Sequence, residues 1–181
     1  MNSSYNNKVD FGDIISTVTF IKNPKTIVEC GILEGFSLSK FIENSNINTQ
    51  IDAYDIFDKF NGNHAIKDKI VQQFNLYDNV TIDYGDFYDV YKKYNDKSID
   101  ILHIDIANNG DVYEYMFKNY INKVKDDGII LMEGGSNQRD HVEWMTKYNK
   151  PKIKPVLDKY MTNFDIKTIG GLPSLTIIKK T

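Results

Sequence analysis

The sequence predicts an α/β fold built on a doubly wound, seven-stranded sheet that is mostly parallel and ends in a C-terminal antiparallel hairpin. Short apolar segments alternate with segments of helical periodicity up to about Tyr148, which is typical of a parallel sheet with helices on both faces. Two glycines, Gly31 and Gly35, follow the first apolar segment. Near the C-terminus, two strand-like segments are separated only by a turn at Gly170, Gly171 and Pro173, which predicts a hairpin.

The strands and helices follow from these patterns in chain order. Apolar residues recur at helical spacing from Phe11 to Ile21, and Pro24 ends that helix because proline cannot continue it. We expect parallel strands at 26–30, 51–55, 79–84, 99–105 and 128–133. We expect helices at about 35–43, around Ile66, Ile70, Val71 and Phe74, at 112–124 with Asp111 and Glu114 as a capping box, and at 139–148. The terminal strands are expected at 164–169 and 175–179.

Length and composition predict one globular domain over residues 1–181, in which residues 1–24 supply a helix before the sheet. The chain has 181 residues, of which 41% are hydrophobic and 26% charged, enough for one core. A formal charge of -3, with acids and bases mixed along the chain, does not provide the basic surface that nucleic acids need. Nucleic acid is therefore a disfavoured partner.

The location that the sequence predicts is the cytoplasm. Cys30 is the single cysteine and cannot form an internal disulfide, which fits a reducing compartment. The first residues lack the apolar core of a signal peptide, and no apolar run approaches the ~20 residues needed to span a bilayer. We expect no membrane partner.

The segment from Thr26 to Phe41 predicts a site for a nucleoside-containing cofactor. A short strand ends in Glu29-x-Gly31, and the chain then turns through Gly35-x-Ser37 into a helix. Glycine has no Cβ, so its backbone can approach a ligand closely, and the N-terminus of the helix offers free N–H groups. The spacing differs from the G-x-G-x-x-G of dinucleotide sites.

This pattern resembles motif I of class I S-adenosylmethionine-dependent methyltransferases. The E-x-G-x-x-x-G-x-S form is most similar to that of small-molecule O-methyltransferases of the macrocin and catechol groups, and the resemblance extends to Glu133. It implies a Rossmann-like sheet and cofactor contacts from Glu29, Gly31, Gly35 and Ser37.

Acidic residues that close later strands extend the resemblance. Asp55 ends the second strand, where its carboxylate would accept the ribose hydroxyls. After the third strand, Asp86 would bond the adenine amino group and Phe87 would lie near the ring, although an acid there also suits a helix N-cap. Asp105, after the fourth strand, would bind the ammonium group of the cofactor.

Asp105 and Glu133 end adjacent strands and are candidate catalytic residues. Two close carboxylates repel, which either raises one pKa for general-base work or favours a divalent cation. Mg²⁺ held by Asp105 and Glu133 is therefore one alternative. However, metal-dependent relatives carry Asp followed by Asp or Asn after the fifth strand, whereas this chain has Glu133-Gly134-Gly135. Asn108, Asn109 or Asp111 could supply oxygen instead.

Among the histidines, His141 is the candidate catalytic base, because it follows the fifth strand and histidine titrates near neutral pH. Arg139 in the same segment could orient an anionic substrate or be a solvated charge. His103 shares a strand face with Asp105, but a histidine in the sheet that is bonded to backbone is the commoner explanation.

The predicted function is methyl transfer from S-adenosylmethionine to a hydroxyl of a small molecule, such as a sugar or nucleotide-sugar. One alternative is a catalytically inactive protein that binds the cofactor for regulation or assembly. Another is a nicotinamide or nucleotide protein, against which the missing third glycine argues. The short segment before the first strand predicts an open pocket or one completed by a second subunit, which leaves a homo-oligomer open.

Overall fold

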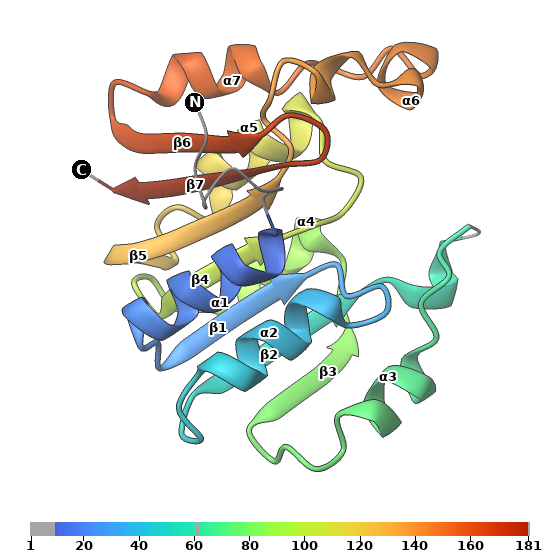
Figure 1. The fold of residues 1–181 in the computed structure, drawn as a ribbon, viewed down its shortest axis with the longest axis vertical. Coiled ribbons are helices and arrows are strands. Elements are labelled where there is room, and N and C mark those ends of the chain that lie inside the picture. The colour runs from blue at the N-terminus through green and yellow to red at the C-terminus, as the bar shows by residue number, and fades with distance from the viewer. Residues whose placement is uncertain (1–9, 61, 181) are drawn as a thin grey trace, which may run out of the picture.

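A computed structural model describes residues 10–60 and 62–180, and its centre is a seven-stranded sheet (Figure 1). The strand order is β3-β2-β1-β4-β5-β7-β6. The strands are β1 (Thr26–Cys30), β2 (Gln50–Asp55), β3 (Val80–Tyr84), β4 (Ile99–Ile104), β5 (Val124–Glu133), β6 (Phe164–Gly170) and β7 (Ser174–Lys180). The first five strands pair in parallel, and β7 pairs antiparallel with both β5 and β6. The predicted fold class is confirmed.

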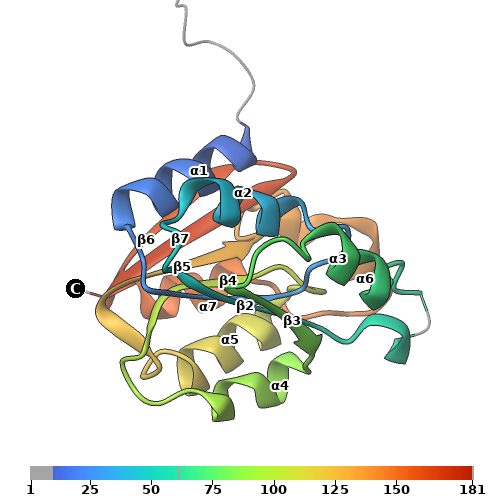
Figure 2. The same cartoon turned by 90° about the horizontal axis from the view of Figure 1, so that it is seen from below.

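Helices cover both faces of this sheet (Figure 2). They are α1 (Phe11–Lys22), α2 (Phe36–Asn44), α3 (Lys67–Gln73), α4 (Phe87–Val90), α5 (Gly110–Asn119), α6 (Glu143–Lys147) and α7 (Lys154–Tyr160). One apolar core lies between the sheet and α1, α2 and α3, and a second lies between the sheet and α4, α5 and α7. All six residues of β4 are buried, as expected for a strand that is covered on both sides.

The N-terminal helix is confirmed from Phe11 onward, while residues 1–9 lie outside the described part of the chain. The side chain of Asp10 caps it by accepting a bond from Gly12 N. Asn23 adopts a left-handed conformation (φ 46°) at its end. The helix therefore ends at Lys22, and only Asn23 separates it from Pro24.

Three helix predictions need correction. The N-cap of α5 is Asn109, whose side chain accepts from Asp111 N, so Asp111 lies inside the helix rather than capping it. Val124 belongs to β5 and not to this helix, because β5 begins beside Ile99 and pairs with β4 through an irregular register. On α3, Ile66 and Val71 are exposed, and only Ile70 and Phe74 of the expected face are buried.

The region after β5 also differs from the prediction. The single helix expected over 139–148 is a 3₁₀ turn at Arg139–His141 followed by α6. Asp140 explains the break, because its buried carboxylate accepts bonds from Ile153 N (2.7 Å) and Lys154 N (2.8 Å) at the start of α7. The sequence reading missed α7, whose Pro155 stands in the first turn, a position that tolerates proline.

Within the described residues, no helix combines the length and apolar content that a bilayer crossing requires.

Asp100 joins the starts of three strands. Its carboxylate is 6% exposed and accepts bonds from Lys25 N and Thr26 N, each at 3.0 Å, at the start of β1. It also pairs with Lys125 Nζ of β5 at 2.8 Å. A single buried side chain of β4 thus ties β1, β4 and β5 together at their amino ends.

We expect Asp100→Ala to lower the free energy of unfolding by about 2–4 kcal/mol, because it leaves two strand amides and one lysine without their acceptor. Urea denaturation measures this change. Asp127→Ala is the control, since Asp127 pairs with Lys22 at an exposed position, where such pairs contribute about 0–1 kcal/mol. Equal losses in the two variants would contradict this role of Asp100.

Candidate functional site

A cavity of about 840 Å³ lies at the carboxyl ends of the parallel strands. It is lined by residues that follow β1, β2, β3 and β4, by Glu133 at the end of β5, and by parts of α1 and β7. The strand order reverses between β1 and β4, and ligands of open α/β sheets bind at such a reversal. Its volume suits a cofactor-sized molecule.

The cavity collects most, but not all, of the predicted site residues. The predicted residues that line it are Gly31, Ser37, Asp55, Asp86, Phe87, Asp105 and Glu133. Glu29, Gly35 and His141 are not among the lining residues.

The two glycines meet protein atoms rather than open space. Gly31 has φ 93°, and a Cβ on it would lie 1.9 Å from the carbonyl oxygen of Asp105. Gly35 has φ 82° at the start of α2, and its Cβ would lie 2.7 Å from the ring of Phe74. The glycines predicted a close approach of this backbone to a ligand, whereas the approach that Gly31 permits is to the loop after β4.

Glu29 lies in β1, just before the turn from Gly31 to Gly35, and contacts residues of α2 and β4. It is fully buried, and its Oε1 accepts a hydrogen bond from Ser37 Oγ of α2 and lies 3.0 Å from Nδ1 of His103. Its Oε2 has no hydrogen-bond partner among the described residues. Burial lowers the pKa of His103, but the hydrogen bond and charge of Glu29 outweigh it, so the pKa is raised. The partner of His103 is thus a carboxylate, which its strand position alone did not reveal.

Asp55 organises two loops at the end of β2. Its Oδ2 accepts bonds from Ile32 N (2.8 Å) and Leu33 N (3.3 Å), which follow β1. Its Oδ1 accepts bonds from Phe57 N (2.8 Å) and Asn63 Nδ2 (2.7 Å). The carboxylate therefore holds the glycine turn as well as facing the cavity.

Asp86 and Phe87 occupy the start of α4. Asp86 is an N-cap, because its side chain accepts a bond from Tyr88 N at 2.9 Å, and it also lines the cavity. Phe87 is buried, and its ring stacks on Tyr120 with centroids 5.1 Å apart. Both residues combine a structural contact with a place at the cavity wall.

Asp105 has a carboxylate exposed to the cavity that accepts no hydrogen bond from the described residues. Protein surrounds it on the remaining sides. This desolvation raises its pKa, the positive charge of His103 opposes the shift, and the negative charges of Glu133 and Glu29 add to it. An acid that lacks a partner and has a raised pKa is a candidate proton acceptor or cation-binding group.

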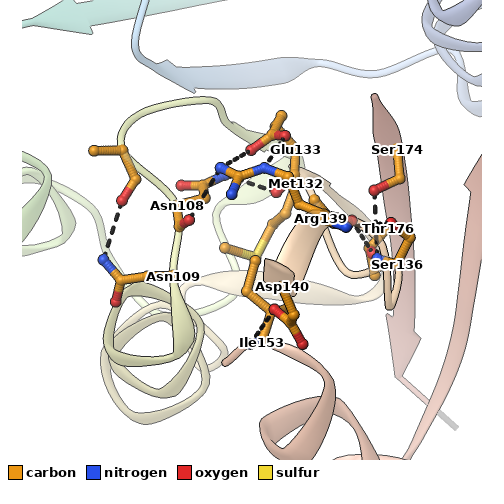
Figure 3. A network of polar contacts seen from close by, with 12 residues as sticks. Asn108, Asn109, Met132, Glu133, Ser136, Arg139, Asp140, Ile153, Ser174 and Thr176 are labelled. Carbon is orange, nitrogen blue, oxygen red and sulfur yellow. Dashed lines mark hydrogen bonds and ion pairs between the residues drawn. The ribbon is translucent and has the colours of Figure 1, made fainter. Parts of the chain in front are cut away.

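Glu133 is paired with Arg139, contrary to the expectation for both residues (Figure 3). Arg139 Nε and Nη2 donate to the two carboxylate oxygens at 2.6 and 2.9 Å. The guanidinium is buried, and Nη2 also donates to the carbonyl of Asn108 at 3.2 Å. Arg139 is therefore neither a solvated charge nor free to bind substrate, and Glu133 is neutralised by a bidentate pair.

The same network accounts for Gly134 and Asn108. Gly134 has φ 97°, and its Cβ would lie 2.8 Å from Ile153, so this turn favours glycine. Asn108 Nδ2 donates to the carbonyls of Ile104 and Glu133 at 3.0 and 2.9 Å, which ties the ends of β4 and β5 together. No sequence pattern indicated that Arg139 would fold back onto these loops.

His141 lies away from the cavity lining. Its Nδ1 is 2.7 Å from the carbonyl of Asn137, and its Nε2 is 2.9 Å from Lys152 Nζ. His141 therefore lies outside the lining of this cavity, in the 3₁₀ turn that replaces the start of the expected helix. Its role as a catalytic base stays a prediction from sequence.

The geometry lends no support to the Mg²⁺ alternative. Within residues 10–60 and 62–180, no group of three histidine, cysteine or acidic side chains is placed to hold a metal ion. Arg139 already engages both oxygens of Glu133. Asp105 and Glu133 as metal ligands remain a prediction from sequence only.

We expect Asp105→Asn to stabilise the protein at neutral pH. The raised pKa means that ionised Asp105 is penalised in the folded state; the penalty is absent below the ordinary pKa of 3.8 and grows as the pH rises through the folded value. Water in the cavity screens part of it, so the gain is below about 1 kcal/mol, or roughly 2–4 °C in Tm at most.

Thermal unfolding of both proteins between pH 3.5 and 8 tests this expectation. Asp126→Asn is the control of opposite sign, because a hydrogen bond from Lys97 lowers the pKa of Asp126, so this variant should not gain stability at pH 7. The assignment would be contradicted if the gain in Tm of Asp105→Asn over the unchanged protein were smaller at pH 7 than at pH 4.

Solved structures with the same fold are methyltransferases. A putative O-methyltransferase from Klebsiella pneumoniae has a TM-score of 0.73 at 11% identity and covers 99% of this chain and 83% of its own. The O-methyltransferase from Bacillus cereus, in complex with SAH, has a TM-score of 0.70 at 14% identity, with 98% and 84% covered. TomG from Streptomyces achromogenes, an O-methyltransferase of tomaymycin synthesis in complex with SAM, has a TM-score of 0.69 at 14% identity, with 96% and 82% covered.

At these identities the likeness concerns the fold. No curated protein sequence shows a significant match. The family model described as "Methyltransferase domain" matches residues 28–133, which run from the middle of β1 to Glu133 at the end of β5. The match spans more than half of the chain and the strand ends that build the cavity, and the chain therefore belongs to the methyltransferase domain family.

Proposed function

We propose that this protein binds S-adenosylmethionine and transfers its methyl group to a hydroxyl of a small molecule. The observation that carries the proposal is the Asp105 carboxylate, which faces the cavity at the strand-order reversal without a hydrogen-bond partner among the described residues. The cofactor carries an ammonium and a sulfonium, and an acidic cavity favours such a cation. The SAM and SAH complexes of proteins with this fold support the same cofactor.

Asp55, Asp86 and Phe87 would hold the nucleoside part. Three of the four bonds to Asp55 come from backbone amides that fix the loops, and the fourth comes from the side chain of Asn63. A ribose hydroxyl can replace Asn63 without disturbing the backbone. Asp86 keeps one carboxylate oxygen free of its capping bond, and that oxygen suits an adenine amino group.

Glu29 would act through the glycine turn rather than by touching the cofactor, because it does not line the cavity. It is bonded to Ser37 and His103, which do line the cavity. These contacts hold the start of α2 against β1 and β4. We propose that they position the glycine turn.

S-adenosylmethionine supplies an electrophilic methyl group. In the proposed reaction a carboxylate oxygen of Asp105 accepts the hydroxyl proton of the acceptor while the oxygen–carbon bond forms and the carbon–sulfur bond breaks. Orientation of the two reactants can contribute ~7–11 kcal/mol over a bimolecular encounter. Glu133, paired with Arg139, would keep the loop after β5 in place rather than take the proton.

The predictions of acceptor, location, domain extent, oligomer and metal are part of the proposal, but they differ in what supports them. A sugar or nucleotide-sugar acceptor, a cytoplasmic location, one domain over residues 1–181 and a homo-oligomer rest on the sequence. Mg²⁺ is the least supported of them, because Arg139 engages Glu133. A protein that binds the cofactor without turnover is not favoured, because the unpaired carboxylate of Asp105 at the cavity supports a role in transfer.

Calorimetric titration of the purified protein with S-adenosylmethionine and S-adenosylhomocysteine tests the proposed function, with NAD as the control ligand. We expect micromolar binding of the first two, no binding of NAD, and the same affinities with Mg²⁺ as with EDTA. Absence of binding in both conditions would refute the cofactor assignment. Affinity that depends on Mg²⁺ would restore the metal alternative.

Asp55→Asn is expected to weaken S-adenosylhomocysteine binding roughly 10–100-fold, as the loss of hydrogen bonds to a charged group does. The matched control is Asp58→Asn, because Asp58 bonds Tyr84 at 2.6 Å and does not line the cavity. Calorimetry gives both affinities, and circular dichroism checks that each variant is folded. Equal affinities in the two variants would remove Asp55 from the cofactor site.

A further inference from the structure

The charges that line the cavity are mostly negative. The lining carboxylates are Glu34, Asp55, Asp86, Asp105 and Glu133. Glu133 is neutralised by Arg139, and the other four lie at or after the ends of β1 to β4. Among the described lining residues, Lys150 is the only lysine or arginine. The ammonium and sulfonium of the proposed cofactor cannot pair with this lysine, so its partner would be an anion, either the carboxylate of the cofactor or a group of the methyl acceptor.

Lys150 has no counter-charge within the described part of the chain. Nearby, Lys154 pairs with Asp158, and Lys152 lies 2.9 Å from His141 Nε2. No ion pair or hydrogen bond involves Lys150 Nζ. The protein thus presents one unpaired ammonium at the cavity, in a segment where the next two lysines have polar partners.

The backbone around Lys150 is held firmly against the end of β4. Lys150 N donates to Met145 O at 2.8 Å, and the carbonyl of Pro151 accepts from Gly110 N at 2.7 Å. A Cβ on Gly110 would lie 2.5 Å from the carbonyl of Lys152, so glycine permits this approach to the start of α5. The backbone of this segment is therefore fixed beside the start of α5, and the side chain of Lys150 lines the same cavity as Asn109.

Much of the cavity lining is apolar. It contains Phe11 and Ile15 of α1, Phe36 of α2, and Pro173 and Leu175 around the start of β7. Phe36 is 61% exposed, which leaves its ring available to a ligand. An apolar or ring-shaped body suits these residues, and Lys150 adds one positive charge to the same cavity.

We infer that the methyl acceptor is an anion, a carboxylate or phosphate attached to a hydroxylated ring, and that Lys150 binds its negative group. This inference rests on the proposed function, and it narrows the acceptor class. Lys150 is then a specificity-determining residue that contributes to acceptor binding and not to cofactor binding. The hydroxyl would face Asp105 while the anion is held at the other side of the ring.

Matched pairs of probes test the inference by ligand-observed NMR, with and without S-adenosylhomocysteine. One pair is 3-hydroxybenzoate and 3-hydroxybenzyl alcohol, and the other is glucose 6-phosphate and glucose. The proteins are the unchanged chain, Lys150→Gln, Lys150→Arg and the control Lys147→Gln. Lys147 lies on α6, outside the cavity lining, with its ammonium 5.4 Å from the ring centroid of Tyr148.

We expect the anionic member of at least one pair to bind the unchanged protein at least tenfold more tightly than its neutral partner. Lys150→Gln should abolish that preference, whereas Lys150→Arg and Lys147→Gln should keep it. A preference for 3-hydroxybenzoate would identify a carboxylate as the bound anion, and a preference for glucose 6-phosphate would identify a phosphate. Absence of preference in both pairs, or a preference that survives Lys150→Gln, would overturn the inference.

Calorimetry with S-adenosylhomocysteine on the same samples separates the two proposals. Lys150→Gln should bind it as the unchanged protein does, because the inference assigns Lys150 to the acceptor; a weakened affinity would instead assign Lys150 to the carboxylate of the cofactor and overturn the inference. If the unchanged protein fails to bind it, the cofactor assignment is refuted while the anion preference is still decided by NMR. If it binds but no anion preference exists, the proposed function stands and this inference falls.

Discussion

The close contact between Gly31 and the backbone of Asp105 is the constraint on which the site depends. Asp105 N donates to Cys30 O at 2.9 Å, and the Asp105 carbonyl occupies the space that a side chain at position 31 would need. The loops after β1 and β4 are therefore pressed together where the strand order reverses. This contact opens the glycine turn toward one side and places the Asp105 carboxylate on the cavity.

The acids around this contact differ in whether a basic side chain is paired with them. Glu29 is buried with His103, and Glu133 is joined to Arg139. Burying a carboxylate is costly unless it is paired, so these two acids are committed to the protein. Within the described residues, Asp105 lies near them without such a partner, and its raised pKa reflects the desolvation, to which the neighbouring negative charge adds. Asp105 thus differs from these two acids in being unpaired.

Sequence reasoning succeeded where local chemistry decides the structure. The strand at Thr26–Cys30 was predicted to the residue, and the terminal hairpin follows from its turn residues. It failed where distant groups decide. Asn109 caps α5 in place of Asp111, and Arg139 pairs with Glu133. His141 lies outside the cavity lining, next to Asp140, whose carboxylate binds the backbone at the start of α7. Each of these contacts joins segments that no periodicity relates.

By itself, the sequence determined the order of the strands, the glycine turn and the acids that close the strands, because short-range steric and hydrophobic rules govern them. Only the tertiary structure decided which of these acids are free. A carboxylate becomes structural or available according to the side chains that reach it, and here those come from other strands and loops, as His103 does for Glu29 and Arg139 for Glu133. The same is true of Lys150, whose place at the cavity depends on the packing of its segment against Gly110.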